Sequence, residues 1–196
     1  MSPAVACVSI ILPSLELPLE STLPAPPTVA VILVLLVALL ILSTASLTLL
    51  KSVESYVTSS SGVGAIVTAV LAEALGMDVY YYDVEDKLAL GNATKMNTLK
   101  ELLGISDVIT LHVDDNAANK NFFGETEISQ MKDGAHLVNL SRGFVVDINA
   151  LANALKSGKI AGAAVDVYPS EPRKNGEFYT ELKGLSNVIL TPHVGG

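Results

Sequence analysis

The pattern of hydrophobic and polar positions divides the chain into two unlike parts. Residues 1–50 are almost entirely apolar and carry only Glu16 and Glu20 as charges, whereas every lysine and arginine lies at or after Lys51. From about residue 62 onwards, apolar runs of helical and of strand-like spacing alternate. This change predicts a segment over residues 1–58 that is foreign to a domain over residues 59–196.

The longest hydrophobic run covers residues 29–50 and follows a proline-rich stretch. Its 22 uncharged residues, at about 1.5 Å of rise each, would span roughly the 30 Å hydrocarbon core of a bilayer. The run predicts a transmembrane helix, with a buried helix or a pair of strands as the alternative. If the helix anchors the protein in a membrane, Lys51 favours a cytoplasmic position for the domain that follows.

The second part predicts an α/β domain. Helix and strand signals alternate, and the strands are nearly continuous apolar runs, which is typical of a parallel sheet covered on both faces. Helices are predicted at residues 65–75, from a capping box at Thr98, from Thr126 to about Gly134, and at 148–157 between an Asp147 cap and Gly158. Strands are predicted at residues 77–83, 107–113, 135–140, 160–167 and 187–190.

A glycine pair opens the first predicted helix of this domain. Gly62 and Gly64 could form a turn that brings backbone amides to a pyrophosphate, although Val67 stands where the dinucleotide pattern has a third glycine. Asp83 follows Gly64 by nineteen residues and ends a predicted strand. A carboxylate there can accept the ribose hydroxyls of NAD and repel the 2′-phosphate of NADP. The alternative for the glycine pair is an ordinary tight turn. The alternative for Asp83 is a turn residue that ends the strand.

Three further strand ends carry side chains that suit hydride transfer. Arg142 follows one strand, Asp166 and Glu171 follow the next, and His193 follows the last. Because the carboxyl ends of parallel strands share one edge, these groups should meet there. The guanidinium can clamp a substrate carboxylate, and an imidazole with a carboxylate partner can exchange a proton with a carbonyl oxygen. In the alternative interpretation, Arg142 is a solvated surface residue, Glu171 only ends a turn, and His193 is structural.

Composition narrows the class of function. The net charge is −8 and the twelve basic residues are scattered, so no surface for nucleic acid is expected. The single cysteine, Cys7, cannot form an internal disulfide, and without a cysteine and histidine cluster no metal site is expected. A reducing compartment fits this composition. Of the other histidines, His112 is a weaker candidate for chemistry, and His136 is interpreted as structural.

Two stretches, VNLSRGFVVDINALANALKSGKIAGAAVDVYPSEP and NVILTPHVGG, closely resemble the D-isomer-specific 2-hydroxyacid dehydrogenases. The resemblance covers roughly residues 62–196 and implies a Rossmann-like, doubly wound parallel sheet that binds NAD and forms a homodimer. It implies that Arg142 binds the substrate carboxylate, that His193 is the acid and base, and that Glu171 is its partner. The cofactor-binding residues it implies are Gly62, Gly64, Ala65, Ile66, Asp83, Leu140, Ser141, Asp166, Gly195 and Gly196.

The sequence also departs from the family pattern. The glycine loop looks two residues short, and the stretch before it, VESYVTSSS, is a poor central strand. Asp114 replaces a proline of the family. Most of the family's substrate domain and the helix after the last motif have no counterpart. We therefore expect an incomplete Rossmann-like α/β domain, preceded by a hydrophobic helical segment.

The leading functional hypothesis is a NAD-dependent oxidoreductase. It would transfer a hydride between nicotinamide and a small 2-hydroxy or 2-oxo acid, with 3-phosphoglycerate and 3-phosphohydroxypyruvate as the leading pair. One alternative is a membrane-tethered NAD-binding or interaction module without turnover. The other is a fragment of the enzyme or a mis-joined gene product.

Overall fold

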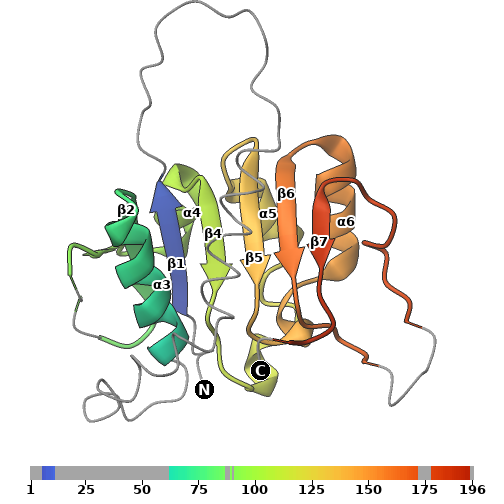
Figure 1. The fold of residues 1–196 in the computed structure, drawn as a ribbon, viewed down its shortest axis with the longest axis horizontal. Coiled ribbons are helices and arrows are strands. Elements are labelled where there is room, and N and C mark those ends of the chain that lie inside the picture. Colours follow the sequence, from blue (N-terminus) through green and yellow to red (C-terminus); the bar gives the residue numbers. More distant parts are fainter. Residues whose placement is uncertain (1–5, 12–61, 87–88, 90, 172–177, 195–196) are drawn as a thin grey trace, which may run out of the picture.

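The computed structural model describes residues 6–11, 62–86, 89, 91–171 and 178–194. Within these residues, seven strands form one sheet in the order β3-β2-β1-β4-β5-β6-β7 (Figure 1). The strands are β1 (Ala6–Ile11), β2 (Asp78–Asp83), β3 (Thr94–Lys95), β4 (Val108–Leu111), β5 (Ala135–Asn139), β6 (Ile160–Val165) and β7 (Val188–Leu190). The described α-helices are α3 (Gly62–Ala74), α4 (Leu99–Ile105), α5 (Glu125–Gln130) and α6 (Ile148–Ser157).

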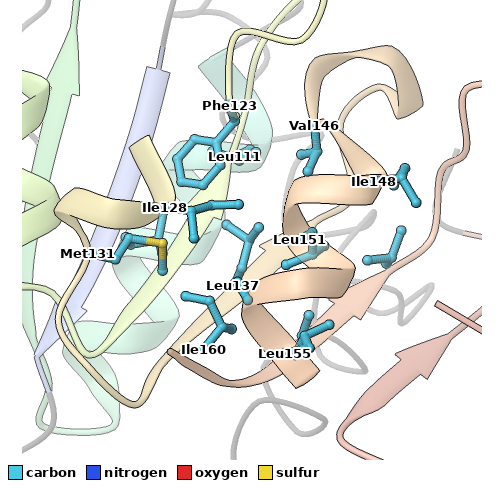
Figure 2. Close-up of a cluster of buried hydrophobic side chains, with 14 of the residues drawn as sticks. Leu111, Phe123, Ile128, Met131, Leu137, Val146, Ile148, Leu151, Leu155 and Ile160 are labelled. Carbon is cyan, nitrogen blue, oxygen red and sulfur yellow. The ribbon is translucent and has the colours of Figure 1, made fainter. Parts of the chain in front are cut away.

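Helices cover both faces of the sheet, as the sequence pattern predicts. On one face, α4, α5 and α6 bury apolar side chains against the strands, and Figure 2 shows this larger cluster around Phe123 and Leu137. On the opposite face, α3 packs Ala69 and Ala72 onto a smaller cluster. Successive positions of β5 serve the two clusters, since Leu137 belongs to the larger and Val138 to the smaller. The predicted doubly wound α/β architecture is confirmed.

Strand β1 is the exception to the predicted parallel sheet. It lies between β2 and β4 and runs antiparallel to both, with Ala6 beside Asp83 and Ile11 beside Asp78. The other neighbouring strands of the described sheet are parallel. The prediction of an entirely parallel sheet is therefore wrong at this position. The stretch before α3, VESYVTSSS, is too polar for a central strand, whereas ACVSII is apolar enough to pair on both sides.

The reversal of β1 changes how the first helix is connected. The start of β1, and not its end, lies at the edge where β2 and β4 end, and residues 12–61 separate β1 from α3. A Rossmann glycine turn instead joins the end of a parallel strand directly to a helix. Strand β1 and helix α3 do not form that unit. Although β1 belongs to the segment over residues 1–58, it is a central strand of the sheet.

The hydrophobic helix predicted over residues 29–50 lies outside the described residues. Among the helices that are described, none is long and apolar enough to cross a bilayer. The longest of them, α3, has 13 residues, and a bilayer core requires about 20.

Local sequence signals correctly locate the starts of two helices, α4 and α6. Thr98 and Glu101 form the predicted capping box at the start of α4. The Asp147 carboxylate caps α6 by accepting hydrogen bonds from the backbone N–H groups of Asn149 and Ala150, at 2.9 and 3.1 Å. The two caps predicted from the sequence, at Thr98 and at Asp147, are therefore confirmed.

Helix α5 differs from its prediction. It begins at Glu125, not at Thr126, and ends at Gln130, well before Gly134. The Glu127 carboxylate accepts a hydrogen bond from the backbone N–H of Gly124 at 3.0 Å. This contact satisfies the start of the helix without a threonine cap.

Replacing Asp147 by alanine is expected to lower the free energy of unfolding by about 1 kcal/mol, because two N–H groups at the start of α6 lose their acceptor. Urea denaturation followed by circular dichroism measures this change. The matched control is Asn153→Ala, on the exposed side of the same helix, which should leave stability unchanged or slightly raised. An unchanged midpoint for Asp147→Ala would contradict the assigned cap.

Candidate active site

The carboxyl edge of the sheet, where β2 and β4 to β7 end, collects most of the predicted site residues. The strands β4 to β7 end in register, because Leu111 lies beside Asn139, Asn139 beside Val165, and Val165 beside Leu190. The loops after these strands therefore leave the sheet at one level (Figure 1). They carry Arg142, Asp166, Glu171 and His193.

His193 and Glu171 form a hydrogen-bonded pair at this edge. Imidazole Nδ1 lies 2.8 Å from Glu171 Oε2, and each side chain is 39% exposed. This hydrogen bond from His193 is the main cause that lowers the pKa of Glu171, and the backbone N–H of Tyr168, 3.2 Å from Oε1, lowers it further. The backbone of His193 is left-handed, with φ of 52°, which is uncommon for a residue other than glycine. The pair thus combines an ionised carboxylate with an imidazole that solvent or a ligand can reach.

Arg142 follows β5 and is half-exposed at the same edge. Its Nη1 donates a hydrogen bond to the carbonyl of Ser141 at 2.8 Å, and its Nε lies 3.7 Å from Asp115 Oδ2. These contacts use Nε and one N–H of Nη1, and they involve neither N–H of Nη2. The planar fork has five N–H donors, so it can still bind a carboxylate with two hydrogen bonds.

Asp166 lies at the end of β6 and is buried. Its Oδ1 accepts hydrogen bonds from the Thr191 hydroxyl and from the backbone N–H of Val194, the latter at 3.0 Å. The carboxylate therefore joins the end of β6 to the loop of His193. Asp166 therefore lies at the carboxyl edge, beside the loop that carries His193.

Asn139 is a site residue that the sequence argument missed. It is fully buried at the end of β5, where its side-chain amide donates to the carbonyl of Arg142 at 3.2 Å. Its Oδ1 accepts hydrogen bonds from the backbone N–H and the hydroxyl of Ser141, at 3.2 and 2.9 Å. Leu140, which lies between Asn139 and Ser141 in the sequence, is partly buried. The available signal was a lone polar residue at the end of an apolar strand.

The glycine pair does not form the turn that the sequence predicted. Helix α3 begins at Gly62, so Gly62, Gly64, Ala65 and Ile66 all lie in its first turns. A Cβ atom at Gly64 would lie 3.0 Å from Nδ1 of His112, at the end of β4. Burial lowers the pKa of His112 to about 4, so this imidazole is neutral near pH 7. Gly64 thus permits close approach to a histidine that the sequence argument had set aside.

Asp83 ends β2 at the carboxyl edge. It is 7% exposed, and its Oδ1 accepts a hydrogen bond from the backbone N–H of Glu85 at 2.9 Å. This position suits both a ribose-binding carboxylate and a strand-ending turn residue. Gly195 and Gly196, the last predicted cofactor contacts, lie outside the described residues.

Comparison with known proteins decides the family. The profile described as the D-isomer specific 2-hydroxyacid dehydrogenase, NAD binding domain, matches residues 48–195. The chain belongs to this family. The cofactor of the matched domain is NAD, and the loops of Arg142 and His193 lie within the matched range.

Individual members of the family agree with this assignment. The D-3-phosphoglycerate dehydrogenase of Haemophilus influenzae is 54% identical over 129 residues, which cover 65% of this chain and 32% of the relative. D-3-phosphoglycerate dehydrogenase 1 of Saccharomyces cerevisiae is 50% identical over 137 residues, 65% of this chain and 29% of the relative. The chain thus spans about a third of the length of these curated family members.

Solved structures of the family share the fold. The D-isomer specific 2-hydroxyacid dehydrogenase of Lactobacillus delbrueckii ssp. bulgaricus, in its NAD complexed form, is 30% identical with a TM-score of 0.59, over 67% of this chain and 43% of that chain. A glyoxylate reductase from Paecilomyes thermophila is 36% identical with a TM-score of 0.59, over 67% of this chain and 39% of that chain. The Rossmann-like family fold is therefore present.

Proposed function

We propose that this chain carries the NAD-binding part of a dehydrogenase that transfers a hydride between nicotinamide and a small 2-hydroxy or 2-oxo acid. The observation that carries the proposal is the 2.8 Å hydrogen bond between His193 and Glu171, at the sheet edge that also presents Arg142. A cation for a carboxylate and a paired imidazole for a carbonyl oxygen are the two protein groups that this reaction requires.

The proposed substrate pair is 3-phosphoglycerate and 3-phosphohydroxypyruvate, as in serine biosynthesis. It is supported by the identities of 54% and 50% to relatives named as D-3-phosphoglycerate dehydrogenases. The solved relatives also include a glyoxylate reductase and a D-mandelate dehydrogenase. Unphosphorylated 2-oxo acids are therefore the comparison substrates for any assay.

The proposed mechanism assigns one task to each of three side chains. Nicotinamide, when bound, supplies or accepts the hydride at the substrate carbon. Arg142 binds the substrate carboxylate and so fixes its orientation. Because Nδ1 of His193 donates to Glu171, Nε2 is the nitrogen that exchanges a proton with the substrate oxygen. Glu171, as an anion, orients the imidazole and stabilises its charged form during the transfer.

We assign the cofactor contacts to the same edge. Asp83 would accept the adenosine ribose hydroxyls, Leu140 and Ser141 would line the cofactor, and Asp166 would lie beside the nicotinamide amide. The first turn of α3 at Gly62 lies at this edge and can direct backbone N–H groups to a pyrophosphate. The reversed β1 replaces the usual strand before that helix. The nicotinamide end of the site is therefore the better fit, and the pyrophosphate end departs from the family geometry.

Arg142→Ala is expected to raise the KM for 3-phosphohydroxypyruvate about 10- to 100-fold, since two charge-assisted hydrogen bonds to its carboxylate are lost. The dissociation constant for NADH should stay the same. Oxidation of NADH, followed at its absorbance maximum, measures the KM. The matched control is Lys156→Ala, which removes a cation at the end of α6 beside the opposite edge of the sheet. An unchanged KM for Arg142→Ala would contradict the assigned role.

A second candidate function is a NAD-binding or interaction module without turnover. It is favoured by the reversed β1, which stands where the family has the strand that leads into the glycine turn. Tight NADH binding without oxidation of any 2-oxo acid would support it over the dehydrogenase. In this candidate, the segment over residues 1–58 tethers the domain over residues 59–196 to a membrane through residues 29–50. Both candidates include a homodimer, which light scattering of the purified chain tests.

A further inference from the structure

We propose that Tyr168 is a positioning residue that holds the loops of Arg142, Glu171 and His193 in one arrangement, an inference that rests on the proposed hydride-transfer function. Tyr168 lies three residues after the end of β6, between the buried Asp166 and Glu171. It lies in the loop of Glu171, where its backbone N–H meets that carboxylate, and it contacts the other two loops through its hydroxyl and its backbone carbonyl.

The hydroxyl of Tyr168 ties β6 to the His193 loop. It lies 2.9 Å from the carbonyl of Thr191 and 3.0 Å from the carbonyl of Val165. The Val165 carbonyl already accepts the backbone N–H of Thr191 at 3.1 Å. When the Tyr168 hydroxyl donates to the carbonyl of Thr191, it therefore adds a hydrogen bond between β6 and the His193 loop beyond the one that the Thr191 N–H already makes. It fixes the chain two residues before His193, whose left-handed backbone requires support on both sides.

The backbone of Tyr168 contacts Glu171 within its own loop and Gly143 in the loop of Arg142. Its N–H donates to Glu171 Oε1 at 3.2 Å, while the second carboxylate oxygen holds His193. Its carbonyl carbon lies against Gly143, where an added Cβ would be only 2.0 Å away. Gly143 directly follows Arg142 along the chain. One residue thus sets the distances between the groups proposed to bind the carboxylate and to move the proton.

The environment of the tyrosine suits a fixed donor. Tyr168 is 9% exposed, and its ring makes an edge contact with that of Phe178, with ring centroids 4.5 Å apart. Burial, together with the carboxylates of Asp166 and Glu171, raises the pKa of Tyr168 to about 12. The hydroxyl therefore remains neutral and keeps its proton for Thr191 at physiological pH.

The test uses Tyr168→Phe, which removes the hydroxyl and keeps the ring. In the full chain we expect kcat to fall about fivefold, the effect of one net hydrogen bond, with the dissociation constant for NADH unchanged. The matched control is Tyr179→Phe, which removes the hydroxyl of a tyrosine that is 80% exposed in the same segment. It should change neither value.

A second readout needs no turnover. The carboxyl ¹³C resonance of Glu171 is followed through a pH titration of wild type and both variants. The pKa of Glu171 is lowered in the wild type by its hydrogen bond from His193 and should move up toward its ordinary value in Tyr168→Phe. Ile160→Val, in the core at the start of β6 and at the opposite edge of the sheet, should lower the unfolding midpoint and leave this titration unchanged, which separates stability from positioning.

The outcomes are distinguishable. A Glu171 titration in Tyr168→Phe that matches both wild type and Tyr179→Phe would overturn the positioning role, as would a variant that no longer folds. A wild-type chain with no turnover but with the expected shift in Tyr168→Phe would keep the positioning role and refute the hydride-transfer function. Loss of kcat together with the shift would support both.

Discussion

Replacing His193 by alanine is expected to lower kcat for the reduction of 3-phosphohydroxypyruvate by about 10²- to 10⁴-fold, the usual contribution of general acid–base catalysis. The imidazole is proposed to give the proton that the substrate oxygen needs as the hydride arrives. The other histidine at this edge of the described residues is His112 at the end of β4, and burial lowers its pKa to about 4. Steady-state oxidation of NADH at saturating substrate measures kcat directly.

The matched control for this prediction is His136→Ala. His136 lies near the start of β5, at the opposite edge of the sheet from His193, and is partly buried. Its replacement should leave kcat within about twofold of the wild type, since the imidazole lies at the edge of the sheet opposite the site. If His193→Ala retains full kcat while NADH is oxidised, the proposed role of the imidazole is wrong.

The second large effect is expected at Gly143. A Cβ atom at this position would lie 2.0 Å from the carbonyl carbon and 2.2 Å from the carbonyl oxygen of Tyr168. Both contacts are to backbone, so no side-chain rotation relieves them. Gly143→Ala should lower the free energy of unfolding by about 3 kcal/mol, at the upper end of the usual effect of overpacking. It should also displace Arg142 and raise the KM for the 2-oxo acid.

Gly104→Ala is the matched control for the stability measurement. Gly104 lies in α4, and an added Cβ would meet nothing closer than the Gln130 carbonyl at 4.0 Å. Alanine there should stabilise the helix by up to about 1 kcal/mol. Urea denaturation of both variants gives the comparison. Equal midpoints for Gly143→Ala and the wild type would mean that the Arg142 loop does not pack against Tyr168 as the structure has it.

Most elements after residue 62 could be predicted from the sequence because their signals are local, whereas the two-residue strand β3 was not predicted. A capping box at Thr98, an aspartate cap at Asp147 and continuous apolar strands each act within a few residues. The boundaries of α5 were less accurate, because its start depends on a glutamate that reaches back to Gly124. The boundary errors of α5 stay within a few residues.

The place of β1 could not be predicted, because strand pairing is not a local property. The sequence showed that the stretch before α3 is a poor central strand, but it did not show which residues pair between β2 and β4. The segment ACVSII is apolar on both sides of the strand and is compatible with either direction. The antiparallel direction is fixed only by the two partners, at Tyr82 and Leu111 beside Cys7.

The candidate site shows the same contrast. Arg142, Glu171 and His193 could be predicted because each follows an apolar strand within a specific motif. Tyr168 could not, because its hydroxyl bonds to the carbonyl of Thr191, 23 residues further along the chain. Asn139 was missed although its contacts, with Ser141 and Arg142, are local. A buried asparagine or tyrosine has many uses, and only the fold shows which carbonyl it meets.

The central claim is that the carboxyl edge of this chain binds NADH and delivers its hydride to a 2-oxo acid. The most direct test incubates the purified full chain with NADH deuterated at C4 and with 3-phosphohydroxypyruvate, and analyses the product by mass spectrometry. We predict a 2-hydroxy acid that carries deuterium at C2, formed by the wild type and not by His193→Ala. Saturable NADH binding with no deuterated product from any 2-oxo acid would contradict the claim.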